Sequence, residues 1–190
     1  MKILDFMGIP LLKPALLQCK FILVAWLNVS NKWLPNPFRK WYLRRFGIVI
    51  GKKSSIHRGC RFFHVGKFEI GNHSVINFGC YLDNRRGISI GNNVGIAHNT
   101  KIYPLGHNID SPKFETKGVP VVIEDNVFIF SNAIIMPGVT IHEGAIVLAG
   151  SVVTKDIESR MVVGGNPAKP IRKRTADINY NSSYQYLFAL

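Results

Sequence analysis

The sequence is poor in acidic residues and in cysteine. Its 190 residues contain 11 Asp and Glu against 24 Lys and Arg, giving a formal net charge of +13. Such a charge favours anionic partners such as phosphates, nucleic acid or anionic lipid surfaces. Three cysteines cannot all pair, and Cys60 and Cys80 fall at the same small position of a repeat described below. We therefore predict buried structural thiols in a reducing compartment rather than disulfides.

Long apolar runs are also lacking. No stretch of 18 uncharged apolar residues occurs, so we expect no membrane-spanning helix. The best candidate, residues 11–27, is interrupted by Lys13, Gln18 and Lys20 and has no small-residue cleavage site close behind it, so we do not expect a signal peptide. Helix-turn-helix, zinc-finger and RNA-recognition patterns are missing as well, and we expect no nucleic-acid partner.

The sequence does contain a six-residue repeat. An aliphatic residue occurs at every sixth position, at Ile123, Ile129, Ile135, Ile141, Val147 and Val153. Residues that adopt a left-handed backbone at low cost follow three positions later, at Asn126, Asn132, Gly138, Gly144, Gly150 and Asp156. This period predicts short strands separated by corners, each strand pointing one aliphatic side chain inward, as in a parallel β-helix.

The repeat continues upstream in sets of three. These sets are Ile90, Ile96 and Ile102; Ile70, Ile76 and Leu82; and Ile50, Ile56 and Phe62. Three repeats close one triangular turn, so we predict five turns. The first sets start 20 residues apart instead of 18, which predicts small bulges such as residues 63–67. A longer break predicts an extended loop at about 104–120, and such an excursion from a regular solenoid is commonly functional.

The first 46 residues follow a different pattern. Leu16, Leu17, Phe21, Val24 and Leu27 have helical spacing, and residues 39–46 mix aromatic side chains with four basic ones. Two interpretations stay open for residues 1–46: a cap on the open end of the coil, or a cap that also contacts an anionic membrane surface. The C-terminal tail, residues 175–190, is polar and then aromatic, and we expect it to pack on a neighbouring subunit.

Three runs carry a family resemblance: INFGCYLDNRRGISIGNNVGIAHNTKIYPLGH, VVIEDNVFIFSNAIIMPGVTIHEGAIVLAGSVVTKDI and VVGGNPAKPIRKR. They resemble the hexapeptide-repeat acyltransferases, in particular the branch of galactoside and maltose acetyltransferases and polysaccharide O-acetyltransferases. The resemblance covers roughly residues 50–174 and implies a left-handed parallel β-helix domain at 47–174. It also implies a homotrimer with active sites between subunits, acetyl-CoA as the donor and a sugar hydroxyl as the acceptor.

Acetyl transfer to an alcohol needs a base for the hydroxyl proton and donors for the developing oxyanion. Of the six histidines, His107 alone lies in the interrupting loop, and it matches the family's catalytic histidine. The resemblance assigns to Ser131 a backbone N–H that faces the thioester carbonyl, and to Asn77 a contact with the acceptor. Asp83 either binds a sugar hydroxyl, orients His107, or is a corner residue that bonds its own backbone.

Coenzyme A needs an apolar path for its pantetheine arm and cations for its phosphates. The residues that match the family's donor contacts are Phe128, Ser131, Ala149, Gly150, Thr154, Lys155, Lys169 and Arg172. Lysine suits phosphate as a point charge and arginine as a bidentate fork. Many relatives have tryptophan in place of Phe128 and glycine in place of Phe130, so the length of the acyl donor stays open.

The sequence thus predicts a cytoplasmic O-acetyltransferase, peripheral at the inner membrane face if residues 1–46 contact lipid. It would modify a sugar hydroxyl in cell-surface polysaccharide synthesis, with His107 as general base. The alternatives are an N-acetyltransferase of an amino sugar nucleotide and an antibiotic acetyltransferase. A γ-type carbonic anhydrase would need three histidine ligands, two of them five residues apart. The histidines here are never five apart, so we expect no metal site.

Overall fold

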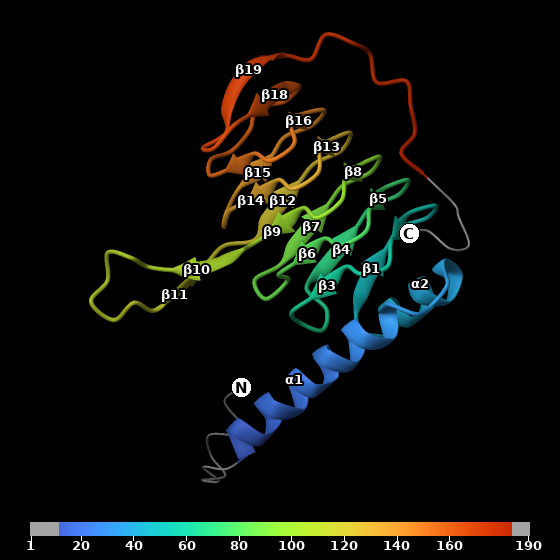
Figure 1. Ribbon diagram of the computed structural model, residues 1–190, viewed down its shortest axis with the longest axis vertical. Coiled ribbons are helices and arrows are strands. Elements are labelled where there is room, and N and C mark those ends of the chain that lie inside the picture. The colour runs from blue at the N-terminus through green and yellow to red at the C-terminus, as the bar shows by residue number, and fades with distance from the viewer. Residues whose placement is uncertain (1–11, 184–190) are drawn as a thin grey trace.

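The computed structural model describes residues 12–183, with side chains from residue 15 onward. Within these residues, two helices come first, α1 (Leu12–Asn31) and α2 (Asn36–Arg45), and a long coil of short strands follows (Figure 1). Pro37 lies in the first turn of α2, where a missing backbone N–H costs nothing. The start of the predicted N-terminal segment, residues 1–11, and the end of the predicted tail, residues 184–190, lie outside the described residues.

The coil is built from three parallel sheets, each of which receives one strand from each of five complete turns; sheet B receives a sixth parallel strand, β18, after them. Sheet A contains β1 (Ile48–Ile50), β4 (Phe68–Ile70), β7 (Ile88–Ile90), β12 (Val121–Ile123) and β15 (Thr140–Ile141). Sheet B contains β2 (Ser55–Ile56), β5 (Val75–Ile76), β8 (Gly95–Ile96), β13 (Phe128–Ile129), β16 (Ile146–Val147), β18 (Met161–Gly164) and the antiparallel β19 (Lys169–Lys173). Sheet C contains β3 (Arg61–Phe62), β6 (Tyr81–Leu82), β9 (Lys101–Ile102), β14 (Ile134–Ile135) and β17 (Val152–Val153). The predicted left-handed parallel β-helix with an N-terminal helical segment is confirmed.

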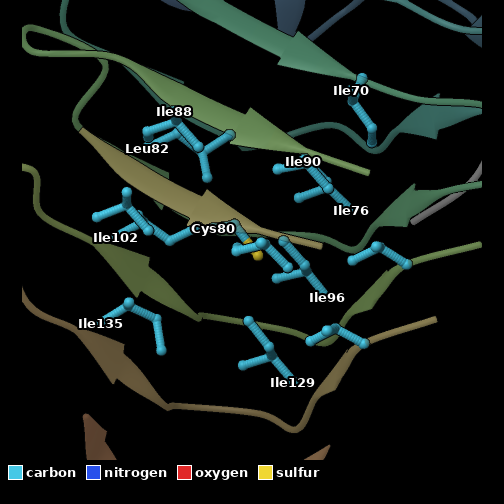
Figure 2. Close-up of a cluster of buried hydrophobic side chains, with 14 of the residues drawn as sticks. Ile70, Ile76, Cys80, Leu82, Ile88, Ile90, Ile96, Ile102, Ile129 and Ile135 are labelled. Carbon is cyan, nitrogen blue, oxygen red and sulfur yellow. The ribbon is translucent and has the colours of Figure 1, made fainter. Parts of the chain in front are cut away.

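The repeated aliphatic residues form the core of this coil. Ile76 pairs with Ile96 and Ile96 with Ile129 in adjacent turns of sheet B, and all three are 0% exposed. Figure 2 shows their side chains stacked inside the coil together with those of sheets A and C. Burying such a side chain contributes about 1.5–3 kcal/mol, so the period of six is what holds the turns together.

Most of the predicted corner residues adopt the left-handed conformation. Asn126 and Asn132 have φ of 62° and 61°, and Gly144 and Gly150 both have φ of 69°. The prediction was wrong for Asp156, which is absent from the positive-φ residues. Its carboxylate instead accepts the backbone N–H of Thr140 at 2.8 Å. The six-residue spacing shortens at this point, because the chain continues the coil through Ile157, which bridges to Ile141.

Three edges, named here by the sheets that they join, run along the coil. The segments that are longer than the corners at the other two edges all lie at the C–A edge; they are residues 63–67, 83–87 and 103–120. Asn84, which is 0% exposed, joins the first two: its Oδ1 accepts the N–H groups of Phe63 and His64, both at 2.9 Å. The third segment carries the hairpin of β10 (Leu105–His107) and β11 (Thr116–Gly118), which projects away from the coil (Figure 1).

The two helices lie at the first turn of the coil. Leu43 of α2 is 0% exposed, and the buried guanidinium of Arg39 donates hydrogen bonds to the carbonyls of Leu34 and Ile56 at 2.5 and 3.1 Å. Burial lowers the pKa of Arg39. On α1, the side chain of Asn28 pairs with both the N–H and the carbonyl of Phe62 in β3. Within residues 12–183, no helix is both long and apolar enough to span a membrane.

The tail returns along the A–B edge of its own coil. The backbone N–H of Ser182 donates to Asn93 Oδ1 at 2.8 Å, and Asn93 Nδ2 donates to the carbonyl of Tyr180 at 3.0 Å. Asn181 also contacts His73 at 2.7 Å. The part of the tail up to residue 183 therefore packs on the same chain, where the sequence suggested a neighbouring subunit.

Candidate active site

His107 ends strand β10 and is exposed on the projecting hairpin. It pairs with Thr116 of β11, and its ring Nδ1 lies 2.8 Å from the carbonyl oxygen of Phe114. A carbonyl oxygen can only accept, so Nδ1 carries the proton in this hydrogen bond. In the neutral imidazole, Nε2 is then the basic nitrogen, available to take a proton from a substrate.

Phe114 supports His107 in a second way. Its ring stacks on the imidazole with centroids 4.5 Å apart and planes 8° from parallel. Its backbone has φ of 44°, a left-handed conformation that costs a bulky residue roughly 1–3 kcal/mol and tends to occur at functional sites. Sequence analysis missed Phe114, because nothing in the local sequence signals a phenylalanine in this conformation.

The rest of the hairpin tip is closed by hydrogen bonds around Glu115. Its carboxylate accepts from Ser111 Oγ and from Asn108 Nδ2, and its carbonyl accepts the N–H of Asn108 at 3.0 Å. The hydrogen bond from Ser111 is the main cause of a lowered pKa of the Glu115 carboxyl, and the hydrogen bond from Asn108 adds to it. The tip is thus tied across its two strands next to Phe114.

Asp83 does not contact His107. The carboxylate of Asp83 is 3% exposed and forms a bidentate ion pair with Arg85, with Nε at 2.8 Å and the terminal nitrogen at 2.7 Å. It also accepts the backbone N–H of Arg85 at 3.3 Å, as a corner residue would. The hydrogen bond and charge of Asp83 raise the pKa of Arg85. Within one chain, the group that orients His107 is therefore the carbonyl of Phe114 and not the carboxylate of Asp83.

A second group of predicted residues lies at the B–C edge. Asn77, after β5, donates from Nδ2 to the carbonyl of Ile96 at 3.1 Å. Ser131, after β13, accepts the N–H of Gly150 on its backbone carbonyl at 2.9 Å. Ala149 and Gly150 are exposed, and the space beside Gly150 is open. This edge is therefore accessible to an extended ligand at the turns of β13 and β16.

Two aromatic rings flank this edge. Phe128 lies half-buried over Gly95, where a Cβ atom would come within 2.4 Å of its ring, so the glycine makes room for it. The rings of Phe128 and Phe130 have centroids 4.9 Å apart. Phe130 and Leu148 are 42% and 37% exposed, which makes the edge apolar as well as open.

The predicted phosphate contacts fall in two places. Thr154 and Lys155 follow β17 at the C–A edge, and Lys169 and Arg172 lie on β19 at the end of sheet B. All four are exposed. No group of three His, Cys, Asp or Glu side chains within residues 12–183 is arranged to hold a metal ion.

The predicted residues therefore divide between two edges of the triangular coil. His107, Asp83, Thr154 and Lys155 lie at the C–A edge or on the hairpin that leaves it, whereas Asn77, Ser131, Ala149 and Gly150 lie at the B–C edge. Sheet C separates the two edges, and the hairpin projects outward (Figure 1). One chain does not bring His107 to Ser131.

Comparison with known proteins gives several matches. The bacterial transferase hexapeptide (six repeats) family matches residues 120–155. The chain is 38% identical over 122 residues to a putative acetyltransferase of Schizosaccharomyces pombe, spanning 63% of this chain and 53% of that relative, or about half of its length. It is 30% identical to the galactoside O-acetyltransferase of Escherichia coli K12 over 78% of this chain and 72% of the relative. It is also 30% identical to that bacterium's putative colanic acid biosynthesis acetyltransferase WcaF, over 75% and 80%.

Two solved structures share the fold closely. A maltose O-acetyltransferase from Clostridium difficile 630 is 33% identical, with a TM-score of 0.77 over 85% of this chain and 89% of that one. A hexapeptide-repeat acetyltransferase from Vibrio cholerae O1 biovar eltor, complexed with acetyl coenzyme A, is 30% identical, with a TM-score of 0.76 over 80% and 86%. With this coil, this repeat and these relatives, the chain belongs to the hexapeptide-repeat acetyltransferases.

Proposed function

We propose that this protein transfers the acetyl group of acetyl-CoA to a hydroxyl of a sugar during synthesis of a cell-surface polysaccharide. The observation that carries the proposal is the hydrogen bond from His107 Nδ1 to Phe114, which leaves Nε2 as the basic nitrogen on an exposed hairpin. The galactoside, maltose and colanic acid relatives support a saccharide acceptor, and the acetyl-CoA complex of the Vibrio structure supports the donor.

His107 would act as general base and then as general acid. Nε2 takes the proton of the acceptor hydroxyl as its oxygen bonds to the acetyl carbon. The backbone N–H of Ser131 donates to the carbonyl oxygen as negative charge develops there. When the carbon–sulfur bond breaks, the imidazolium returns the proton to the departing sulfur. The products are free coenzyme A and the O-acetyl sugar, and His107 is neutral again.

The B–C edge fits the donor. Exposed small residues at Ala149 and Gly150 allow an extended pantetheine arm to lie close to the backbone. Lys169 and Arg172 on β19 supply cations for phosphates beyond this edge. Phe128 and Phe130 flank the edge near Ser131 and would limit the length of the acyl group. Asn77, two turns of sheet B before Ser131, would contact the acceptor.

We also propose a homotrimer with sites between subunits, because the two groups of residues lie on different edges of one chain. A second copy can place its B–C edge against the hairpin, which brings Ser131 of one copy to His107 of the other. Both surfaces carry exposed apolar side chains: Phe130 and Leu148 on the edge, Ile109 and Val119 on the hairpin segment. Repetition of one such contact around a threefold axis gives a closed ring.

The first test is acetyl-CoA-dependent release of coenzyme A over a panel of saccharides and amino sugars, followed by identification of the product. A saccharide that yields an O-acetyl product supports the proposal. Turnover confined to amines, with an N-acetyl product, would overturn the O-acetyltransferase assignment in favour of an amino sugar nucleotide or antibiotic acceptor. The reaction would take place in the cytoplasm, with the N-terminal helices at the inner face of the membrane.

A further inference from the structure

We propose that the outward side of α1 and α2 docks the protein on an anionic phospholipid membrane. We call this surface the helical face; it consists of Ile22, Trp26, Val29, Trp33, Phe38 and Trp41. Each of these side chains is between 59% and 76% exposed. Exposed apolar residues are normally scattered singly over a soluble protein, so six large ones within residues 22–41 indicate an interaction site.

The position of α1 explains why this face is uncovered. Leu27 and Asn31 are 0% exposed and turn toward the coil. Ile22, Trp26 and Val29 follow one another at spacings of four and three residues, so they share a different side of the helix. The helix also extends beyond the end of the coil, so that nothing in the chain covers its first turns within residues 15–183 (Figure 1).

The charges around the helical face all have one sign. The sequence contains twelve lysine and arginine residues and no acidic residue between Asp5 and Glu69. The ammonium of Lys32 lies 5.6 Å from the ring centre of Trp33, and the guanidinium of Arg45 lies 5.1 Å from that of Trp41. Tryptophan at the boundary and basic residues beside it are the composition of surfaces that lie in the interface of an anionic bilayer.

This charge favours a membrane over a second copy of the chain. A contact between identical helical faces would bring Lys32 and Arg45 of one copy toward those of another, with no carboxylate in this part of the sequence to offset them. Anionic headgroups complement the charge, and the apolar side chains reach the acyl region below them.

The test is co-sedimentation of the full chain with vesicles of phosphatidylcholine, with and without phosphatidylglycerol. We expect binding at least about tenfold tighter when phosphatidylglycerol is present, and loss of most of that gain in high salt. The exposed thiol of Cys19, one turn before Ile22, supplies a second readout. Its reaction with a water-soluble maleimide should slow severalfold when anionic vesicles are added.

Paired substitutions locate the contact. We expect Ile22→Gln with Trp26→Gln to weaken binding to anionic vesicles by about tenfold or more, because glutamine keeps helix propensity but removes the apolar surface. The matched control is Val49→Gln with Ile171→Gln, which changes two exposed aliphatic residues outside the helices and should bind as the wild type does. The double variant Lys32→Gln, Arg45→Gln should reduce only the increase in vesicle binding that phosphatidylglycerol produces.

Three results would overturn the proposal. The first is equal binding to vesicles with and without phosphatidylglycerol, and the second is an equal loss in the control pair. The third is a change in oligomeric mass of the Ile22→Gln, Trp26→Gln variant with unchanged vesicle binding, which would assign the helical face to contacts between copies. Binding is measured without acetyl-CoA or sugar, so its failure would leave the proposed acetyl transfer untouched.

Discussion

Phe114 holds His107 from two directions: its carbonyl oxygen accepts the Nδ1 proton at 2.8 Å, and its ring stacks on the imidazole at 4.5 Å. The two residues are seven positions apart and meet because β10 and β11 pair across the hairpin. A single residue thus sets both the tautomer and the plane of the proposed base, at the expense of an unfavourable backbone angle at Phe114.

Replacement of His107 by alanine should abolish most of the acetyl transfer. A general base contributes about 10²–10⁴-fold, so we expect a loss of at least about a hundredfold in kcat with an unchanged melting temperature. His142→Ala is the control, because His142 pairs with Glu124 at the A–B edge, away from the hairpin. Coenzyme A release measures both. Full activity of the His107→Ala variant would remove His107 as the base.

Phe114 should act as a positioning residue. Phe114→Leu removes the stacked ring, and we expect kcat to fall about tenfold while KM for acetyl-CoA stays within about twofold. Phe114→Tyr keeps an aromatic ring and should recover most of the activity. If Phe114 served only the stability of the loop, kcat would not differ between the leucine and tyrosine variants. Equal losses of kcat in both variants would therefore contradict the prediction.

Mixed oligomers should regain activity if sites form between copies. The His107→Ala and Asn77→Ala variants should each be inactive alone. In a mixed oligomer, a site that combines Asn77 of the first variant with His107 of the second contains both residues intact. Random assembly of equal amounts should restore about a quarter of the wild-type rate in a cyclic trimer. The mixture is denatured and refolded together, and each variant treated alone is the control. No recovery in a mixed oligomer of confirmed mass would place both residues in one chain's site.

Ser131 should be insensitive to loss of its hydroxyl. The proposed donor is its backbone N–H, which alanine retains, so Ser131→Ala should keep kcat within about threefold of the wild type. Ser131→Pro removes that N–H and should lose on the order of a hundredfold; its melting temperature shows whether the edge is still folded. A large loss in a well-folded Ser131→Ala variant would mean that the hydroxyl itself takes part.

The three thiols should differ in reactivity. Cys60 and Cys80 are 1% and 0% exposed, and each Sγ lies 3.2 Å from a backbone carbonyl of the next turn. The hydrogen bond with Cys60, followed by burial, raises the pKa of the Cys80 thiol. The thiolate is the reactive form, so we expect Cys19 alone to react rapidly with a disulfide reagent at pH 8, and the other two only after unfolding. Cys19→Ser is the control and should remove the rapid phase.

Alkali should also destabilise the fold through Cys80. Its pKa is raised on folding, so above the ordinary thiol pKa of about 8.5 the unfolded chain loses a proton that the folded chain retains. The free energy of unfolding should then fall as the pH rises from 8 to 10, by up to about 1.4 kcal/mol for each pH unit. Urea unfolding measures this slope, and Cys80→Ala should reduce it. A slope unchanged by Cys80→Ala would assign the effect to other groups.

The sequence alone determined the coil, its five complete turns, its aliphatic core and the place of the interrupting loop, but not the further parallel strand β18. These features follow from local periodicity. When an aliphatic residue recurs every six positions with a bend in each repeat, a coil of short strands is the regular arrangement that buries all of these aliphatic side chains. His107 could be singled out for the same reason, as the histidine where the period breaks.

Only the tertiary structure decided which residues meet. Contacts between strands or across corners place the ring of Phe114 on His107 and pair Asp83 with Arg85. Such contacts also let Asn84 join two segments of the C–A edge by hydrogen bonds. The division of the predicted residues between two edges is likewise a property of the assembled triangle. Periodicity specifies distance along the chain, whereas a reaction needs atoms that are close in space, and only packing supplies that.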